Sequence, residues 1–158
     1  MRSTILGGLA TAFLFAASPT YAAPADDAAA AVTTVLDKFN GGDINAFFTA
    51  HREGALIVDE FAPYVWGGPQ SVQRWAGDYD ADAKRRGISG GRIDYGKPIH
   101  AASDGSSAYI VLPSTYRFVQ NGAKMAGAGS MTFVMAREAG AWKISSWTYS
   151  GALPTPER

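Results

Sequence analysis

Three stretches of the chain carry hydrophobic residues at the three- and four-residue spacing of a single buried helix face. Their members are Val32, Val35, Leu36 and Phe39; Ile44, Phe47 and Phe48, with His51 one turn further on; and Val72, Trp75, Ala76, Tyr79 and Ala83. Asp43 can cap the second helix, because a carboxylate accepts hydrogen bonds from the free N–H groups of a first turn. Pro69 opens the third helix, and Gly87 follows its basic last turn as a C-cap. The pattern therefore predicts three helices before residue 90.

A strand pattern occupies residues 55–59, and strand-like runs fill the chain after residue 90. These later runs cover about residues 91–102, 107–120, 123–138 and 141–150, with the turn sequences SDGSS, QNG and EAGA between them. Helices that precede an antiparallel meander can lie across one face of the twisted sheet and bury it. The order of elements predicts an α+β fold, in which three N-terminal helices pack on a curved, mostly antiparallel sheet and leave a cavity between the two layers.

Asp59 closes the first strand and shares a strand face with Ala55 and Ile57, since alternate residues of a strand point to the same side. A helical cover over that face would partly desolvate the carboxylate, and burial raises the pKa of an acid toward that of a useful general base. The alternative is an acid on the surface before a turn. Asp59 is therefore a candidate catalytic residue.

His51 follows the apolar face of the second helix and could approach the strand that carries Asp59. A pair of His51 and Asp59 would act as a proton shuttle, because the ordinary pKa of histidine lies near neutrality. The alternative is that His51 compensates the C-terminal end of its helix, where the helix dipole favours a basic side chain. His51 is the second candidate catalytic residue, and this mechanism requires a hydrogen bond to Asp59, directly or through one water.

Aromatic side chains are numerous and could line a cavity for a flat or apolar molecule. The candidate ligand-binding residues are Tyr64, Trp66, Trp75, Tyr79, Tyr116 and Trp147. Each could instead belong to the core, where aromatic residues are common. Strand alternation predicts that Tyr116 and Arg117 point to opposite sheet faces, and that Trp142 and Trp147 also diverge.

Composition and charge exclude several classes of partner. The 158 residues suffice for one domain, and 14 basic side chains balance 14 acidic ones, so no basic surface for nucleic acid or an anionic membrane is expected. Cysteine is absent, which excludes disulfides, thiolate chemistry and cysteine zinc sites. The two histidines lack the spacing of a metal site, and no cofactor fingerprint is present, so neither a metal nor a cofactor is expected.

The first 22 residues have the pattern of a signal peptide. Arg2 supplies a positive start, residues 5–17 form an apolar stretch of thirteen, and small residues flank a cleavage point near Ala22. A membrane anchor is the alternative, but the stretch is shorter than the roughly 20 residues that span a bilayer. The pattern predicts a signal peptide over residues 1–22, a domain over residues 23–158, and a periplasmic or secreted protein without a membrane segment after cleavage.

The sequence resembles the NTF2-like superfamily, and within it the SnoaL-like and ketosteroid-isomerase-like branch. The resemblance rests on a first helix ending in NGGD, on INAFF, on a short strand ending in aspartate, on GGPQSVQRW at the third helix, and on WKISSWTYSG in the last strand. It covers residues 26–151 in order and implies a cone-shaped fold and a homodimer.

The same resemblance places Asp59 at the position of the general base of ketosteroid isomerases. Val35 stands where those enzymes have a tyrosine, and residues 130–133 lack the acid that they have in a late strand. Enolate stabilisation in ketosteroid isomerases depends on those two donors. The resemblance therefore implies the fold and the base, and it does not imply ketosteroid isomerase activity itself.

Three functional hypotheses follow. The first is an exported domain that binds a small apolar or aromatic molecule in the cavity between helices and sheet. The second is a cofactor-free isomerase, dehydratase or cyclase, with Asp59 as general base, His51 as shuttle and a tyrosine such as Tyr64 or Tyr116 as donor. The third is a homodimeric assembly module that uses the open face of the sheet.

Overall fold

The computed structural model of the chain describes residues 22–157, and this part contains three helices and eight strands. The helices are α1 (Ala22–Asn40), α2 (Ile44–Ala50) and α3 (Ser71–Arg86). The strands are β1 (His51–Val58), β2 (Val65–Trp66), β3 (Ile88–Tyr95), β4 (His100–Ser103), β5 (Ser107–Gln120), β6 (Ala123–Glu138), β7 (Ala141–Gly151) and β8 (Thr155–Pro156). The apolar stretch of the predicted signal peptide lies outside the described residues.

The ends of the short helices follow from local chemistry, as the sequence predicts. The Asp43 carboxylate accepts a hydrogen bond from the Ala46 N–H at 3.0 Å and so caps α2. Gly87 ends α3 with a φ of 66°, a left-handed conformation that glycine adopts without steric cost. At the other end of α3 the buried Ser71 hydroxyl donates to the Ala55 carbonyl at 2.6 Å. This bond fixes the start of α3 against β1.

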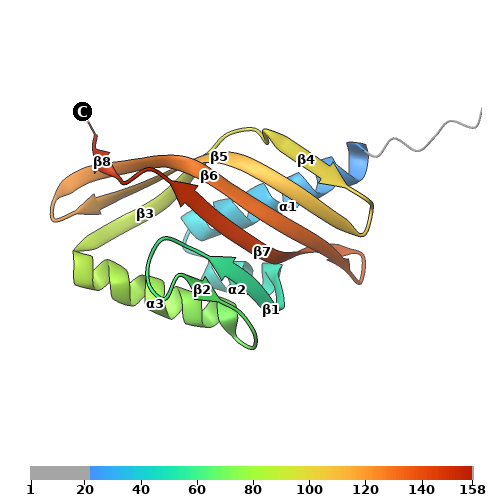
Figure 1. Cartoon of the computed structure of the whole chain (residues 1–158), viewed down its shortest axis with the longest axis horizontal. Coiled ribbons are helices and arrows are strands. Elements are labelled where there is room, and N and C mark those ends of the chain that lie inside the picture. Colours follow the sequence, from blue (N-terminus) through green and yellow to red (C-terminus); the bar gives the residue numbers. More distant parts are fainter. Residues whose placement is uncertain (1–21, 158) are drawn as a thin grey trace, which may run out of the picture.

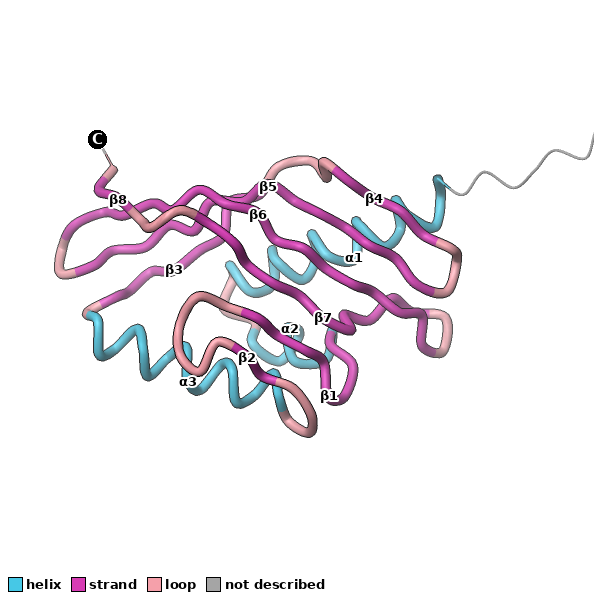
Figure 2. The backbone as a smooth tube through the Cα atoms, viewed as in Figure 1, coloured by secondary structure: helices cyan, strands magenta, loops and turns pink. Residues whose placement is uncertain are grey.

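The sheet has the strand order β2-β1-β7-β6-β5-β3, with β4 paired to β5 and β8 paired to β6. Its pairs are antiparallel except for β1 and β7, which run parallel. Figure 2 shows the long strands β5, β6 and β7 side by side, with α1 behind them. The predicted α+β class and the mostly antiparallel sheet are confirmed.

The sheet curls, and α3 closes the curl. Helix α3 contacts β1 and β2 at one edge of the sheet and β3 at the other edge, while α1 packs across β3, β4, β5 and β7 (Figure 1). One helix can touch both edges only because the strands twist and bend toward each other. The concave face is thereby covered by helices, and its side chains form the core, which includes Ile57, Leu112, Phe133 and Ile144.

One prediction about side-chain direction is confirmed and another is wrong. Tyr116 faces the interior while the neighbouring Arg117 forms an ion pair with Asp94 on the outside. Trp142 and Trp147, however, lie on the same face of β7. The register against β6 shifts at Ser145, because that residue has no partner between the pairs Met135–Ile144 and Val134–Ser146. A bulge of one residue reverses the alternation beyond it.

Candidate functional site

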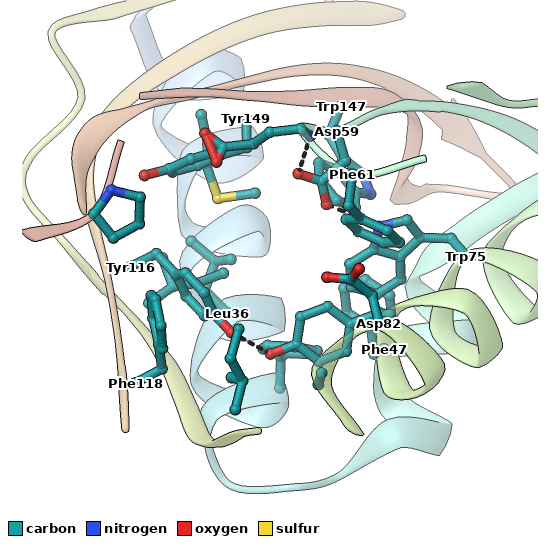
Figure 3. Close-up of a pocket in the computed structure, with 18 of the residues that line it drawn as sticks. Leu36, Phe47, Asp59, Phe61, Trp75, Asp82, Tyr116, Phe118, Trp147 and Tyr149 are labelled. Carbon is teal, nitrogen blue, oxygen red and sulfur yellow. Dashed lines mark hydrogen bonds between the residues drawn. The ribbon is translucent and has the colours of Figure 1, made fainter. Parts of the chain in front are cut away.

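A cavity of about 190 Å³ lies between the curled sheet and the three helices. Figure 3 shows its side chains around a central space, with Tyr116 and Phe118 opposite Asp59 and Trp75. The lining is mostly apolar and comes from every helix, from β3, β5, β6 and β7, and from the segments after β1 and β7. An apolar hollow with few polar groups is the usual form of a small-molecule site.

Asp59 lies on the wall of this cavity, and three hydrogen bonds hold it there. Its backbone N–H donates to the Tyr64 carbonyl at 3.0 Å, which closes the turn after β1. Its carboxylate accepts from the Glu60 N–H at 2.8 Å and from the Trp75 indole N–H at 2.9 Å. Burial nevertheless raises the pKa of Asp59 above its ordinary value, against the two hydrogen bonds that lower it. The strand pattern thus located the acid correctly, on the same face as Ala55 and Ile57.

Two tyrosine hydroxyls form a second polar group in the cavity. Tyr79 on α3 and Tyr116 on β5 are joined by a hydrogen bond of 2.7 Å between their hydroxyl oxygens. Gly91 makes room for this pair, because a Cβ at that position would overlap both hydroxyls. Burial raises the pKa of both tyrosines, and the charge of Asp59 raises it further. Both hydroxyls therefore stay protonated, and because one of them donates to the other, the second can donate to a ligand.

Trp75 is the centre of the aromatic wall. Its ring stacks on Tyr79 with centroids 5.4 Å apart and meets Trp147 edge-on at 5.1 Å. Phe47 of α2 contacts the same ring at 5.4 Å. Trp75 also donates to Asp59, so a single buried side chain orients both the carboxylate and the aromatic faces beside it.

His51 is not near Asp59. Its Nδ1–H donates to the Phe47 carbonyl at 2.7 Å, which is a bond to the last turn of α2. In the pairing of β1 with β7, His51 lies opposite Ile144 and Val58 lies opposite Thr148. Ile144 and Thr148 are four residues apart on β7, so the two ends of β1 are separated by about 13 Å along the sheet. The hydrogen bond between His51 and Asp59 that the shuttle mechanism requires is therefore absent. The contact that is present places His51 at the end of α2, as in the alternative, but as a hydrogen-bond donor rather than as a positive charge.

The environment of His51 is solid core. Only 7% of the residue is exposed, and its Nε2 is buried without a hydrogen-bond partner among residues 22–157. Burial lowers the pKa of His51 to about 4, so the ring is neutral at pH 7.

Of the predicted aromatic residues, Trp75, Tyr79, Tyr116 and Trp147 line the cavity, while Tyr64 and Trp66 do not. Tyr64 is 57% exposed on the turn that holds Asp59. Trp66 is buried behind the wall, where its indole N–H donates to Asp78 at 2.8 Å and its ring packs on Phe61 at 5.0 Å. Trp66 thus supports Phe61, which faces the cavity.

Several lining residues were missed by the sequence interpretation, and helical spacing could have found two of them. Asp82 and Arg86 follow Tyr79 at three and seven positions, on the same face of α3, and both line the cavity. They are joined by an ion pair of 3.1 Å. Tyr149 was not missed, because it belongs to the aromatic set of the sequence; it lies two residues after Trp147 on β7 and also points inward, as the two-residue period of a strand predicts.

The positions that lack the donors of ketosteroid isomerases also face this cavity. Val35 on α1 and Met131 and Phe133 on β6 line it with apolar side chains. The polar groups have a different origin here, since the hydroxyl pair comes from α3 and β5.

A curled sheet closed by helices over an apolar cavity defines an NTF2-like cone. The sequence profile of the SnoaL-like domain matches residues 28–155, and the chain belongs to this family. A search of curated proteins found no match.

Solved structures show the same fold at low sequence identity. A nuclear transport factor 2 (NTF2-like) superfamily protein from Salmonella enterica has a TM-score of 0.67 and 14% identity, over 84% of this chain and 93% of that one. A ketosteroid isomerase-like protein from Erwinia carotovora has a TM-score of 0.64 and 14% identity, over 82% and 97%. The S. rosetta CaMKII hub has a TM-score of 0.63 and 18% identity, over 87% and 100%. These likenesses show the fold alone.

Residues 22–157, the part of the chain that the structure describes, also give two negative findings. No helix in this part of the chain is long and apolar enough to cross a membrane. No three histidine or acidic side chains in it come together as possible metal ligands.

Proposed function

We propose that this SnoaL-like domain binds a small, mainly aromatic molecule in the cavity between its helices and its sheet. The observation that carries the proposal is the cavity itself, an apolar hollow of about 190 Å³ with aromatic faces and a few polar groups. An apolar cavity of about 150 Å³ accepts benzene, so one ring with a short substituent is the expected size.

The polar groups suit the recognition of a substituent on such a ring. The hydroxyl pair of Tyr79 and Tyr116 offers a donor or an acceptor, and the Asp59 carboxylate offers acceptors. Buried polar groups of this kind fix the orientation of a ligand while the aromatic faces supply most of the binding free energy.

Thermal-shift and calorimetric titration with 2-phenylethanol, indole and 4-methylphenol test the proposal. A ligand that binds only the folded state raises the melting temperature in a concentration-dependent way. Val35→Phe would fill part of the cavity and abolish the shift, whereas Val65→Phe, at an exposed position of β2, would leave it unchanged. Absence of any shift or heat with all three compounds in the wild type would refute the proposal.

Cofactor-free proton abstraction with Asp59 as general base is the second candidate function. It is favoured by the raised pKa of Asp59 and by a hydroxyl pair in the same cavity, which could hold a carbonyl oxygen. In D₂O, a small aromatic ketone such as phenylacetone would exchange the protons beside its carbonyl for deuterium, as followed by NMR. Exchange that continues unchanged in Asp59→Asn would exclude Asp59 as the base.

Homodimer assembly is the third candidate role, and a row of exposed apolar residues favours it. Leu56, Val134 and Tyr109 lie on neighbouring strands of the outer sheet face, joined in register through Ser146. The CaMKII hub with the same fold also suggests assembly. Light scattering at micromolar concentration would give a dimer mass for the wild type and a monomer mass for Val134→Lys. A monomeric wild type would remove this role.

Export rests on the sequence alone, through the signal-peptide pattern of residues 1–22. We expect a mature chain that begins near residue 23 in the periplasm or the medium. Mass spectrometry of the protein recovered from these fractions would give its first residue, and an uncut chain held in the cytoplasm would contradict export.

A further inference from the structure

The charged side chains around the cavity are mainly acidic. Asp59, Glu60 and Asp82 line it, against one basic residue, Arg86. Asp82 accepts hydrogen bonds from Arg86 and from Arg85, so these three side chains together keep one positive charge. Among the ion pairs of residues 22–157, none includes Asp59 or Glu60. The acids that line the cavity nevertheless outnumber its one base, and Asp59 and Glu60 carry the excess negative charge.

Asp59 carries this charge on the cavity wall without a cationic partner. Its two hydrogen-bond donors, the Trp75 indole and the Glu60 N–H, are both neutral. A buried charge without an opposite charge is unfavourable, and a cation brought to it recovers part of that cost. The unfavourable desolvation of the carboxylate has already occurred on folding, before any ligand enters.

Aromatic faces next to Asp59 suit the same kind of ligand. Trp75, Tyr79 and Trp147 form one packed group, with Trp75 within hydrogen-bond distance of the carboxylate. The face of an aromatic ring attracts a cation through its quadrupole, and the attraction is stronger where water is excluded. Figure 3 shows Asp59 and Trp75 on one side of the hollow and Tyr149 above it.

The negative field extends across the cavity. Burial is the main reason why the pKa values of Tyr79 on α3, Tyr116 on β5 and Tyr149 on β7 are raised, and the charge of Asp59 raises all three further. Burial also raises the pKa of Glu60, and Asp59 adds to this rise while Arg86 opposes it. The field of Asp59 thus reaches three elements around the hollow, where it opposes an anionic ligand and favours a cation.

We propose that the cavity selects a small organic cation, an ammonium group attached to one aromatic ring, with the ammonium at Asp59 and the ring against Trp75 and Trp147. This inference rests on the proposed binding function and names the chemical class of its ligand. The size of the cavity limits the ligand to one ring and a short chain.

Three ligands with the same skeleton test the charge preference. At pH 7 2-phenylethylamine is a cation, 2-phenylethanol is neutral and phenylacetate is an anion. Titration calorimetry of the wild type is expected to give the tightest binding for the amine, about tenfold tighter than for the alcohol, with the carboxylate weakest. Binding of the alcohol as tightly as the amine, or tightest binding of the carboxylate, would overturn the cation preference and leave the proposed binding function standing.

Two charge-neutralising variants locate the preference. Asp59→Asn is expected to lose the tenfold difference between amine and alcohol while it still binds the alcohol. Asp80→Asn also removes one negative charge, but from an exposed position of α3 outside the cavity lining. This variant should keep the tenfold difference in affinity between the amine and the alcohol. A preference that survives in Asp59→Asn would overturn the assignment to Asp59. If none of the three compounds binds the wild type, the proposed function itself fails.

Discussion

The two ends of β1 carry two titratable side chains in contrasting surroundings. At the start of the strand His51 is buried in solid core, bonded to the end of α2. Beyond the other end Asp59 lies on the wall of an open cavity. Burial shifts both pKa values toward the neutral form, downward for the histidine and upward for the acid. A perturbed pKa therefore does not by itself mark a functional site, and of the two groups Asp59 is the one with open space beside it.

The contrast also predicts opposite effects of pH on stability. The folded state binds a proton at His51 more weakly than the unfolded state does, so this group reduces stability as pH falls from about 6.5 to about 4. The folded state binds a proton at Asp59 more strongly than the unfolded state does. Asp59 therefore reduces stability as the pH rises above 3.8, the ordinary pKa of this side chain. Substitutions at the His51 end and at the cavity end of β1 should therefore change stability and binding in different ways.

The largest effect is expected from His51 in acid. With a folded pKa of about 4, His51 reduces the free energy of unfolding by about 2.5 kcal/mol between pH 7 and pH 4.5. His51→Gln keeps a donor for the Phe47 carbonyl without a titratable ring, so urea denaturation at the two pH values should show a correspondingly smaller difference. His100→Gln, on the exposed strand β4, is the control and should behave as the wild type. An unchanged pH dependence in His51→Gln would show that His51 is not the group responsible.

Gly91→Ala should disturb the cavity end with the next largest effect. The added Cβ would displace the hydroxyls of Tyr79 and Tyr116, and overpacking of this kind lowers the free energy of unfolding by about 2 kcal/mol. Ligand binding should weaken in parallel, as measured by thermal shift with 2-phenylethanol. Gly77→Ala, where a Cβ meets nothing on α3, is the matched control and should be neutral or stabilising. Equal effects of the two substitutions would mean that the hydroxyl pair is not held in place by Gly91.

Asp59→Asn should increase stability, in contrast to most substitutions at partly buried positions. Removal of the unpaired carboxylate is expected to raise the free energy of unfolding by about 1 kcal/mol at pH 7.5, as is common when a functional group is removed from a site. The gain should shrink as the pH approaches 3.8, where the wild-type carboxyl is also neutral. Denaturation at both pH values measures it, and a loss of stability at pH 7.5 would indicate that Asp59 is compensated in the fold.

Arg86→Gln should have the smallest effect and should sharpen the cation preference. Arg86 is the one basic side chain among the described residues that line the cavity, and its removal leaves Asp82 with Arg85 as a partner. The affinity for 2-phenylethylamine is expected to rise about threefold, because charges at a partly exposed position contribute less than about 1 kcal/mol. Calorimetry of the amine in both proteins measures the change, and a weaker affinity in Arg86→Gln would contradict the field that we infer.

Local patterns predicted the fold and part of the site, and the misses have physical causes. Alternation along β1 placed Asp59 on the buried face correctly, because this face stays in register through Ala55 and Ile57. The same rule misplaced Trp142, since a bulge at Ser145 depends on pairing with β6 and leaves no local signal. The apolar face of the second helix also suggested that His51 could approach Asp59, but His51 begins β1, and an extended strand holds its two ends apart.

The Tyr79–Tyr116 pair could not be predicted from either segment alone. The two residues lie on α3 and β5, and they meet because the curled sheet brings β5 toward the helix, where a glycine leaves space. Contacts of this kind depend on how the layers pack, which hydrophobic spacing does not encode.

The central claim is that Asp59 is an uncompensated acid on the wall of an open, ligand-binding cavity, and its carboxyl pKa measured by ¹³C NMR tests this most directly. In the free protein the pKa should lie above the ordinary value of 3.8. Saturation with 2-phenylethylamine should lower it, because a nearby cation favours the charged carboxylate, while 2-phenylethanol should not lower it. A carboxyl that titrates at or below 3.8 and responds to neither compound would contradict the account.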